Sequence, residues 1–380
     1  MPWMESTRVR ERMQFVVLAL AHVQSFSALC AQFGIARKTG YKWLARYAEA
    51  QSVADLADRA RIPAHTPNRT PPEVEARAVA LRRQYGWGAR KLQVLLEREG
   101  ITLSEATLNR VIQRNGLLGR ADVRGHATRR FERCLPNDLW QTDFKGPIQL
   151  ARAGERCVPL AILDDHSRFL VGLYALPSTH AQPVRAVLRQ SFQAYGLPRE
   201  ILTDHGTPFW STSNVHGLTN VAVDILNQQV TLLHGAVRHP QTQGKVERLN
   251  RTLQEALRHR GTPRTLPACQ AFFDEFRVQY NTERPHEALG MAVPASRYTP
   301  SVRAFQAEPL PWGYDANMTV RRLNTQGCLD YGGQRLFVSE ALAEQPVGTL
   351  VLEGQLIVQF RDMLIREIQL DSRRGRALKG

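Results

Sequence analysis

The stretch from His239 to Asn250 constrains the fold most, because a loop sequence passes there directly into a strongly patterned helix. Pro240 has no backbone N–H and Gly244 tolerates conformations that other residues avoid, so the first half is expected to be a loop. From about Gln243 onward the apolar residues recur at the spacing of one helical face. They are Val246, Leu249, Leu253 and Leu257. This pattern predicts a helix with one side buried against a core.

Glu247 lies at the edge of that apolar stripe, about 100° around the helix from Val246. Lys245, Arg248 and Arg251 surround it with positive charge and are candidate contacts to DNA. A carboxylate in this position is well placed to hold a metal ion against nucleic acid. The simpler alternative is a surface glutamate paired with Arg251. Two more carboxylates in comparable places favour the metal-binding interpretation.

The charge of the chain indicates a polyanionic partner. The 380 residues carry a net charge of +15, and residues 1–136 hold 23 Lys and Arg against 12 Asp and Glu. No apolar run reaches the ~18 residues of a membrane span. Phe15 to Ala21 is apolar but short and follows several charged residues, so we expect a helix and not a signal peptide. The five cysteines form no CxxC pair, which argues against a zinc site or a disulfide framework and fits a reducing cytoplasm.

Residues 1–58 are expected to form a first helix-turn-helix module. The second of its three short helices runs from about Ser27 to Phe33, and the third begins near Ala36. Gly40 inside the third helix costs about 1 kcal/mol relative to Ala. A small helical bundle with a basic face is the alternative. The candidate DNA contacts are Arg37, Lys38, Thr39, Tyr41 and Lys42.

A second helix-turn-helix module is expected over residues 69–118. Thr70 and Glu73 have the spacing of a capping box that opens a helix to about Tyr85. A second helix spans Gly88 to Glu99, and Ser104 caps a third. The residues available to DNA are Thr107, Asn109, Arg110 and Arg114. Two such modules in tandem suggest a bipartite DNA site.

Residues 119–136 lack periodicity and form a basic linker that includes Arg129 and Arg130. Such a run is often only a solvated connection. Its place between DNA-binding modules and a candidate catalytic domain favours a path along phosphates instead.

The region 137–300 changes character to a mixed α/β domain. We expect strands at Leu139–Leu150, Val158–Leu163, Phe169–Tyr174 and Glu200–Thr203. The expected helices are Ala181–Tyr195 and Gln270–Tyr280, besides the one that carries Glu247. Residues 317–372 show short alternating strands that indicate a small β-barrel or a sandwich, of which we expect the barrel.

Two aspartates lie at sensitive points of those strands. Strand alternation puts Asp143 on the face opposite Trp140, beside Lys145, a further candidate DNA contact. Asp204 ends its strand just before Gly206, a common place for ligand-binding groups. Each alone is an ordinary strand-end residue. Together with Glu247 they suggest three carboxylates that would repel each other unless divalent cations joined them.

Mg²⁺ prefers carboxylate oxygen and leaves positions for phosphate oxygens. Two such ions activate a water or a 3′-hydroxyl for in-line attack at a phosphodiester. Asp164 and Asp165, which lie next to Ser167 at a hairpin end, are expected to serve turn geometry and not to bind metal.

Several motifs together resemble the integrase core of bacterial insertion-sequence DDE transposases. They are Trp140-Gln141-Thr142-Asp143, Leu163-Asp164-Asp165-His166-Ser167-Arg168, Leu202-Thr203-Asp204-His205-Gly206 and the stretch His239 to Arg248. Tyr280-Asn281, Arg284-Pro285-His286, Pro294 and Arg297-Tyr298 match the segment that closes such a core. The spacing of 43 positions from Asp204 to Glu247 is longer than is typical, which makes Ser211 to Val230 a candidate insertion.

The resemblance implies two N-terminal all-α helix-turn-helix modules, an α/β RNase H-like core over 137–300 and a small C-terminal β-barrel. Asp143, Asp204 and Glu247 would be the catalytic, metal-binding acids, with two Mg²⁺ ions that Mn²⁺ is expected to replace. The implied enzyme is a transposase that binds element terminal repeats and target DNA as at least a homodimer and catalyses cleavage and strand transfer. It would work in the cytoplasm at the bacterial nucleoid, with no membrane partner.

Two other functions are open at this point. A catalytically silent, sequence-specific DNA-binding protein, such as a repressor or a domesticated element, would use the core only as a scaffold. A hydrolytic RNase H-like nuclease would cut without strand transfer. The presence of all three acids disfavours the first, and the tandem DNA-reading modules disfavour the second.

Overall fold

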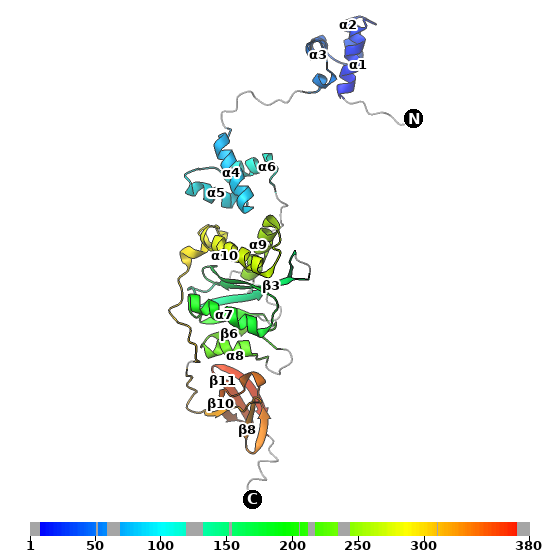
Figure 1. The fold of residues 1–380 in the computed structure, drawn as a ribbon. Coiled ribbons are helices and arrows are strands. Elements are labelled where there is room, and N and C mark those ends of the chain that lie inside the picture. The colour runs from blue at the N-terminus through cyan, green and yellow to red at the C-terminus, as the bar shows by residue number, and fades with distance from the viewer. Residues whose placement is uncertain are drawn as a thin grey trace, which may run out of the picture. The chain divides into compact units, whose positions relative to one another are not determined.

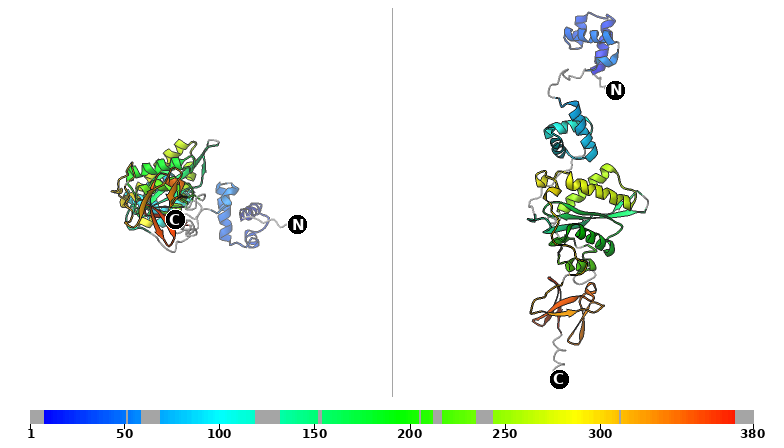
Figure 2. Two further views of the ribbon diagram at one scale, coloured as in Figure 1. Left: turned by 90° about the horizontal axis from the view of Figure 1, so that it is seen from below. Right: turned by 60° about the vertical axis from the view of Figure 1, so that its left-hand side comes forward.

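The computed structural model describes most of the chain as separate compact parts (Figures 1 and 2). The described residues are 8–50, 52–58, 69–118, 132–151, 154–204, 206–211, 217–234, 244–309 and 311–370. One compact unit is Met1–Thr70 and the other is Pro71–Gly380. In the described part of the chain, no helix is both long and apolar enough to cross a bilayer.

The first unit contains the expected three helices, α1 (Arg8–Leu20), α2 (Phe26–Gln32) and α3 (Arg37–Ala50). Ser25 caps α2, and a short 3-10 helix, η1 (Val53–Leu56), closes the unit. The core gathers one apolar face from each helix, since isolated helices of this length are marginal without such packing. Its buried members are Phe15, Val16, Leu29, Cys30, Trp43 and Leu56.

The second helical module consists of α4 (Pro72–Tyr85), α5 (Ala89–Arg98) and α6 (Glu105–Arg114). Ser104 caps α6 as expected, because its Oγ accepts a hydrogen bond from Thr107 N at 3.2 Å. The expected capping box at the start of α4 is wrong. The N-cap is Pro71 and makes no side-chain hydrogen bond. The prolines move the helix start one residue beyond the position that Thr70 needs for capping.

The core is a mixed sheet. Its spatial order is β4 (Leu170–Leu176), β3 (Arg156–Asp164), β1 (Leu139–Phe144), β5 (Glu200–Thr203) and β6 (Thr231–His234), and the short β2 (Ile148–Gln149) pairs with β3. The pairs β1–β3 and β3–β4 are antiparallel, and β1–β5 and β5–β6 are parallel. The expected strand Leu139–Leu150 is thus two strands, β1 and β2.

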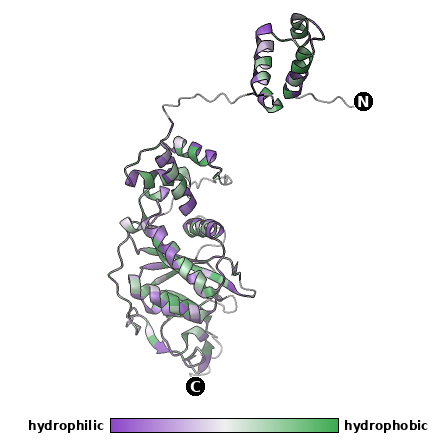
Figure 3. Ribbon diagram, turned by 45° about the horizontal axis from the view of Figure 1, so that its top comes forward, coloured by the Kyte–Doolittle hydropathy of each residue, from purple (hydrophilic) through white to green (hydrophobic). Residues whose placement is uncertain are grey.

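Helices cover both faces of this sheet (Figure 1). On one face, α7 (Ala181–Tyr195) and α8 (Asn220–Asn227) pack on Trp140, Leu160 and Ile162. On the other, α9 (Gly244–Arg260) and α10 (Leu266–Thr282) pack on Ala161 and Leu163. The four residues of the predicted stripe on α9 are all buried. Figure 3 shows the hydrophilic and hydrophobic residues alternating along these helices, as half-buried helices require.

The covering helices bear on one sequence expectation. Strand β1 is buried on both faces, and Gln141, which shares a face with Asp143, is only 1% exposed and donates a hydrogen bond to Asp165. The candidate insertion contains α8, whose Val221, Ala222, Ile225 and Leu226 belong to the main core cluster. This part of the segment is therefore integral to the core.

The C-terminal region is not the expected closed β-barrel. A four-stranded open sheet has the order β12 (Met363–Gln369), β11 (Gln355–Phe360), β10 (Pro346–Leu352) and β7 (Thr319–Arg322). The strands β8 (Cys328–Tyr331) and β9 (Gln334–Phe337) form a separate hairpin. Leu329 and Leu342 share a buried cluster with Val347, Val358 and Phe360, so the hairpin and the 3-10 helix η4 (Glu340–Leu342) bury the sheet's apolar side without barrel closure.

Candidate active site

Parallel pairing places two of the three candidate acids side by side. Strands β1 and β5 pair with Leu139 opposite Glu200 and Gln141 opposite Leu202. The same register, continued two residues further, sets Asp143 opposite Asp204. Both acids therefore lie at the carboxyl ends of neighbouring parallel strands, where ligand-binding groups gather in α/β sheets.

Helix α9 meets this sheet edge through Asn250. Its Nδ2 donates a hydrogen bond of 2.8 Å to Asp143 Oδ2. Glu247 precedes Asn250 by three residues, so the two side chains share one face of α9, and Glu247 is exposed. Sequence reasoning did not single out Asn250. The available signal was its helical spacing from Glu247.

The electrostatics of Asp143 indicate that the three acids are neighbours. The pKa of Asp143 is raised to about 6, mainly by burial and then by the charges of Asp204 and Glu247, whereas the Asn250 hydrogen bond works in the opposite direction. A carboxyl group surrounded in this way binds a proton or a cation more readily than an isolated one.

Gly206 fixes the second acid. Its backbone N donates to Asp204 Oδ1 at 3.0 Å, and a Cβ at this position would lie 3.1 Å from both carboxylate oxygens. A side chain here would crowd the carboxylate. Gly206 therefore lets the main chain approach Asp204 closely.

The donor set fits a hard divalent cation, since it consists of carboxylate and amide oxygens. Asn250 Oδ1 is buried and has no hydrogen-bond partner, which leaves an acceptor oxygen directly beside Asp143. Within the described ranges, no three His, Cys, Asp or Glu side chains are grouped closely enough to hold a metal ion as they stand. Asp143 and Asp204 thus lie at neighbouring strand ends, and Asn250 is the α9 residue that contacts Asp143.

Asp164 serves the turn, as expected for a hairpin-end aspartate. Its carboxylate accepts hydrogen bonds from Asn137 N at 2.7 Å, Ser167 N at 2.8 Å and Ser167 Oγ at 2.6 Å. Burial raises its pKa despite these bonds. Asp165 is also fully buried, and its oxygens contact Gln141, Lys245 and the backbone of Arg133.

The candidate DNA contacts of the helical modules lie mainly on exposed surface. On α3, Arg37, Lys38, Tyr41 and Lys42 are exposed and Thr39 is half-buried. On α6, Asn109 and Arg110 are exposed. Two other α6 residues have protein partners, since Thr107 Oγ1 lies 2.9 Å from Ser104 Oγ and Arg114 Nη2 lies 2.9 Å from Glu75 Oε2.

The cations near the acids differ in exposure. Arg251 is exposed, Lys145 is half-buried, and Arg248 forms a long ion pair with Glu287 at 3.7 Å. Lys245 is directed to Asp165 and its side chain is 15% exposed. Arg129, Arg130 and the loop 239–243 lie outside the described residues.

The motifs that follow α9 hold the core together. Asn281 on α10 accepts from Leu170 N at 2.8 Å and donates to Leu170 O at 3.0 Å, which joins the helix to β4. Tyr298 stacks on Phe169 with ring centroids 4.1 Å apart, and its hydroxyl donates to Asn137 Oδ1 at 2.8 Å. These are structural contacts.

Three segments of the chain match known protein-family models. Residues 228–294 match the family described as "Integrase core domain". Two models described as "Homeodomain-like domain" match residues 6–57 and 39–112.

Several related proteins come from insertion elements and transposons. An uncharacterized 31.7 kDa protein of insertion element IS407 from Burkholderia multivorans is 26% identical over 221 residues, which is 56% of this chain and 75% of that protein. A 39.2 kDa protein of insertion element IS476 from Xanthomonas euvesicatoria is 25% identical over 64% of this chain and 70% of that protein. The transposase of transposon Tn552 from Staphylococcus aureus is 27% identical over 44% of this chain and only 38% of that protein.

Among solved structures, the HTLV-2 integrase catalytic core domain in complex with magnesium matches 43% of this chain and 97% of its own. The identity is 15% and the TM-score is 0.33.

Proposed function

We propose that this chain, which carries an integrase core domain behind homeodomain-like helix-turn-helix domains and is related to insertion-element transposases, is an active DNA transposase. In this proposal it binds the ends of its mobile element, cleaves there and joins the ends to target DNA. The observation that carries the proposal is the β1–β5 register, which aligns Asp143 with Asp204 while α9 contacts Asp143 through Asn250.

Asp143, Asp204 and Glu247 would together hold two Mg²⁺ ions. Mn²⁺ would be able to take the place of Mg²⁺. When bound, the ions activate a water or a 3′-hydroxyl and stabilise the leaving oxygen of the phosphodiester. The acids supply oxygen ligands of the kind that Mg²⁺ prefers.

The other residues of the site orient these acids. Asn250 holds one oxygen of Asp143, and the Gly206 amide holds one oxygen of Asp204. Burial and the neighbouring acids raise the pKa of Asp143 to about 6, and a bound cation would favour its ionised form. Arg248 and Arg251 on α9 would bind phosphates beside the acids.

Recognition of the element ends is assigned to the two helical modules, through Arg37, Lys38, Tyr41 and Lys42 of α3 and Asn109 and Arg110 of α6. Phosphate contacts from the basic linker would add affinity without sequence preference. Since two ends must be joined, we expect at least a homodimer on DNA.

The substitution Glu247→Gln tests the proposal, because it keeps the size and the polarity of the side chain and removes its charge. A strand-transfer assay with Mg²⁺ should show joining reduced by orders of magnitude, about a hundredfold or more, with end binding retained. The matched control is Glu255→Gln, an exposed glutamate two turns further along α9, which should join at the wild-type rate.

Each contrary result identifies a different error. Joining by the Glu247→Gln variant at the wild-type rate would remove Glu247 from the site. End binding by the wild-type protein without any cleavage would favour the silent DNA-binding protein. Cleavage without joining would favour the hydrolytic nuclease.

A further inference from the structure

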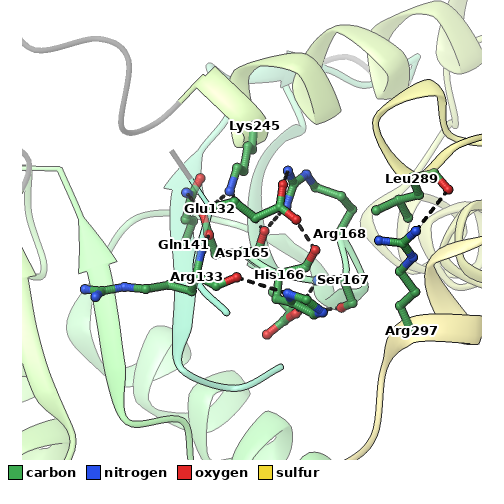
Figure 4. A network of polar contacts seen from close by, with 11 residues as sticks. Glu132, Arg133, Gln141, Asp165, His166, Ser167, Arg168, Lys245, Leu289 and Arg297 are labelled. Atoms are coloured by element: carbon green, nitrogen blue, oxygen red, sulfur yellow. Dashed lines mark hydrogen bonds and ion pairs between the residues drawn. The ribbon is translucent and has the colours of Figure 1, made fainter. Parts of the chain in front are cut away.

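The Asp165 carboxylate is completely buried and joins three segments of the chain (Figure 4). Its Oδ1 accepts one hydrogen bond from Gln141 Nε2 at 2.7 Å and another from Lys245 Nζ at 2.5 Å. Its Oδ2 accepts a hydrogen bond of 2.7 Å from the backbone N of Arg133. We call these four residues the Asp165 network. A buried carboxylate that loses its donors is strongly destabilising, so the three segments are held to it together.

Two partners of Asp165 are close neighbours of the proposed metal ligands. Gln141 precedes Asp143 by two residues on β1, so both side chains point to the same face of the sheet. Lys245 precedes Glu247 by two residues in the first turn of α9. Lys245 Nζ also donates to the backbone O of Asp165 at 3.0 Å. The position of the first turn of α9 relative to β1 therefore depends on Asp165.

The third partner belongs to the linker that follows the second helical module. Arg133 O lies 3.0 Å from His166 Nδ1, and Glu132 Oε2 pairs with Arg168 Nη2 at 2.8 Å. The Arg133 guanidinium pairs with Glu200 on β5. Residues 132–133 thus lie along the turn formed by residues 165–168 (Figure 4).

We propose that Asp165 is a positioning residue that couples the linker at Glu132–Arg133 to the first turn of α9, and so sets where Glu247 lies relative to Asp143. This inference rests on the proposed function of these acids. Its physical basis is that one buried charge accepts hydrogen bonds from all three segments. Displacing the linker removes one donor and loosens the turn that carries Glu247.

The first test replaces Asp165 by Asn, which keeps the shape and removes the charge that holds Lys245. In the full chain without metal, exchange of the amides of residues 248–251, which donate to the carbonyls of the first turn of α9, should rise at least about tenfold. Joining should slow by about tenfold to a hundredfold, since small misplacements of a reacting group have effects of this size. The Mg²⁺ concentration for half-maximal joining should rise severalfold, while end binding stays unchanged.

Three further variants isolate the coupling. Lys245→Met should reproduce the effects of Asp165→Asn, and the double variant should be no worse than either single one. The control Arg260→Met breaks the ion pair of Arg260 with Glu275 at 3.0 Å, at the other end of α9. It should raise exchange only in the last turn and leave the Mg²⁺ requirement unchanged.

The contribution of the linker is tested by comparing two variants. Arg133→Pro removes the backbone N–H that donates a hydrogen bond to Asp165, and Arg133→Ala keeps it. The Pro variant should need more Mg²⁺ than the Ala variant, and equal requirements would overturn the role of the linker. Slower joining by Asp165→Asn with wild-type exchange in α9 and a wild-type Mg²⁺ requirement would overturn the positioning role. If Glu247→Gln joins normally, the proposed function fails, and the exchange measurements still decide whether Asp165 holds α9.

Discussion

Single buried groups set how the core responds to pH, and His286 is a clear case. It is 8% exposed, its Nε2 has no hydrogen-bond partner, and burial lowers its pKa from 6.5 to about 3, with Arg284, Lys91 and Arg248 adding to the effect. Between these two pKa values the unfolded chain binds a proton that the folded chain does not. His286 should therefore lower the stability of the core as the pH drops below 6.5, by about 2 kcal/mol between pH 7 and pH 5. Asp143 opposes part of this loss, because its raised pKa lets the folded chain bind a proton in the same range.

Amide hydrogen exchange of α10 at pH 7 and pH 5, each expressed as a protection factor relative to the free amide at that pH, gives this loss of stability. The variant His286→Gln is neutral at both pH values and should lack the destabilisation at pH 5, keeping only the opposing contribution of Asp143. The same loss in the variant as in the wild-type protein would show that another group titrates.

At the scale of elements, close packing outweighs helix propensity in α3. A Cβ on Gly40 would lie 2.8 Å from the Phe15 ring and 2.9 Å from both Cys30 Sγ and the Phe26 ring. Gly40→Ala should therefore destabilise the first unit by about 1–2 kcal/mol in thermal unfolding, even though Ala is about 1 kcal/mol better than Gly in a helix.

The control for Gly40 is Ala45→Gly, at an exposed position of the same helix, where propensity alone should cost about 1 kcal/mol. A more stable Gly40→Ala protein would mean that the three helices do not pack as closely as the structure has them.

At the scale of the whole molecule, DNA recognition and chemistry are assigned to different parts of the chain. Residues 1–136 carry a net +11 of the +15 and both helical modules. Removing residues 1–118 should abolish the preference for element ends and leave a folded core, as measured by gel-shift binding and circular dichroism. Full end preference by the isolated 137–300 segment would contradict this division.

Local patterns predicted most elements correctly. Periodicity and nearby helix- or strand-breaking residues act over a few positions, so they can be recognised in the sequence. They predict the stripe on α9, the helix Ala181–Tyr195 and the strand Glu200–Thr203. The α4 capping box was wrong because Pro71 and Pro72 change the geometry at the helix start. The closed barrel was wrong because strand alternation gives a buried face but not what covers it.

The sequence by itself determined the two helical modules, the strand and helix ends that carry Asp143, Asp204 and Glu247, and the basic N-terminal third. These depend on side-chain period and charge along the chain. Only the tertiary structure decided that Asn250 holds Asp143 and that Asp165 joins the linker to α9. These hydrogen bonds unite residues from 32 to 107 positions apart, and pairing at such distances depends on packing that no local pattern specifies.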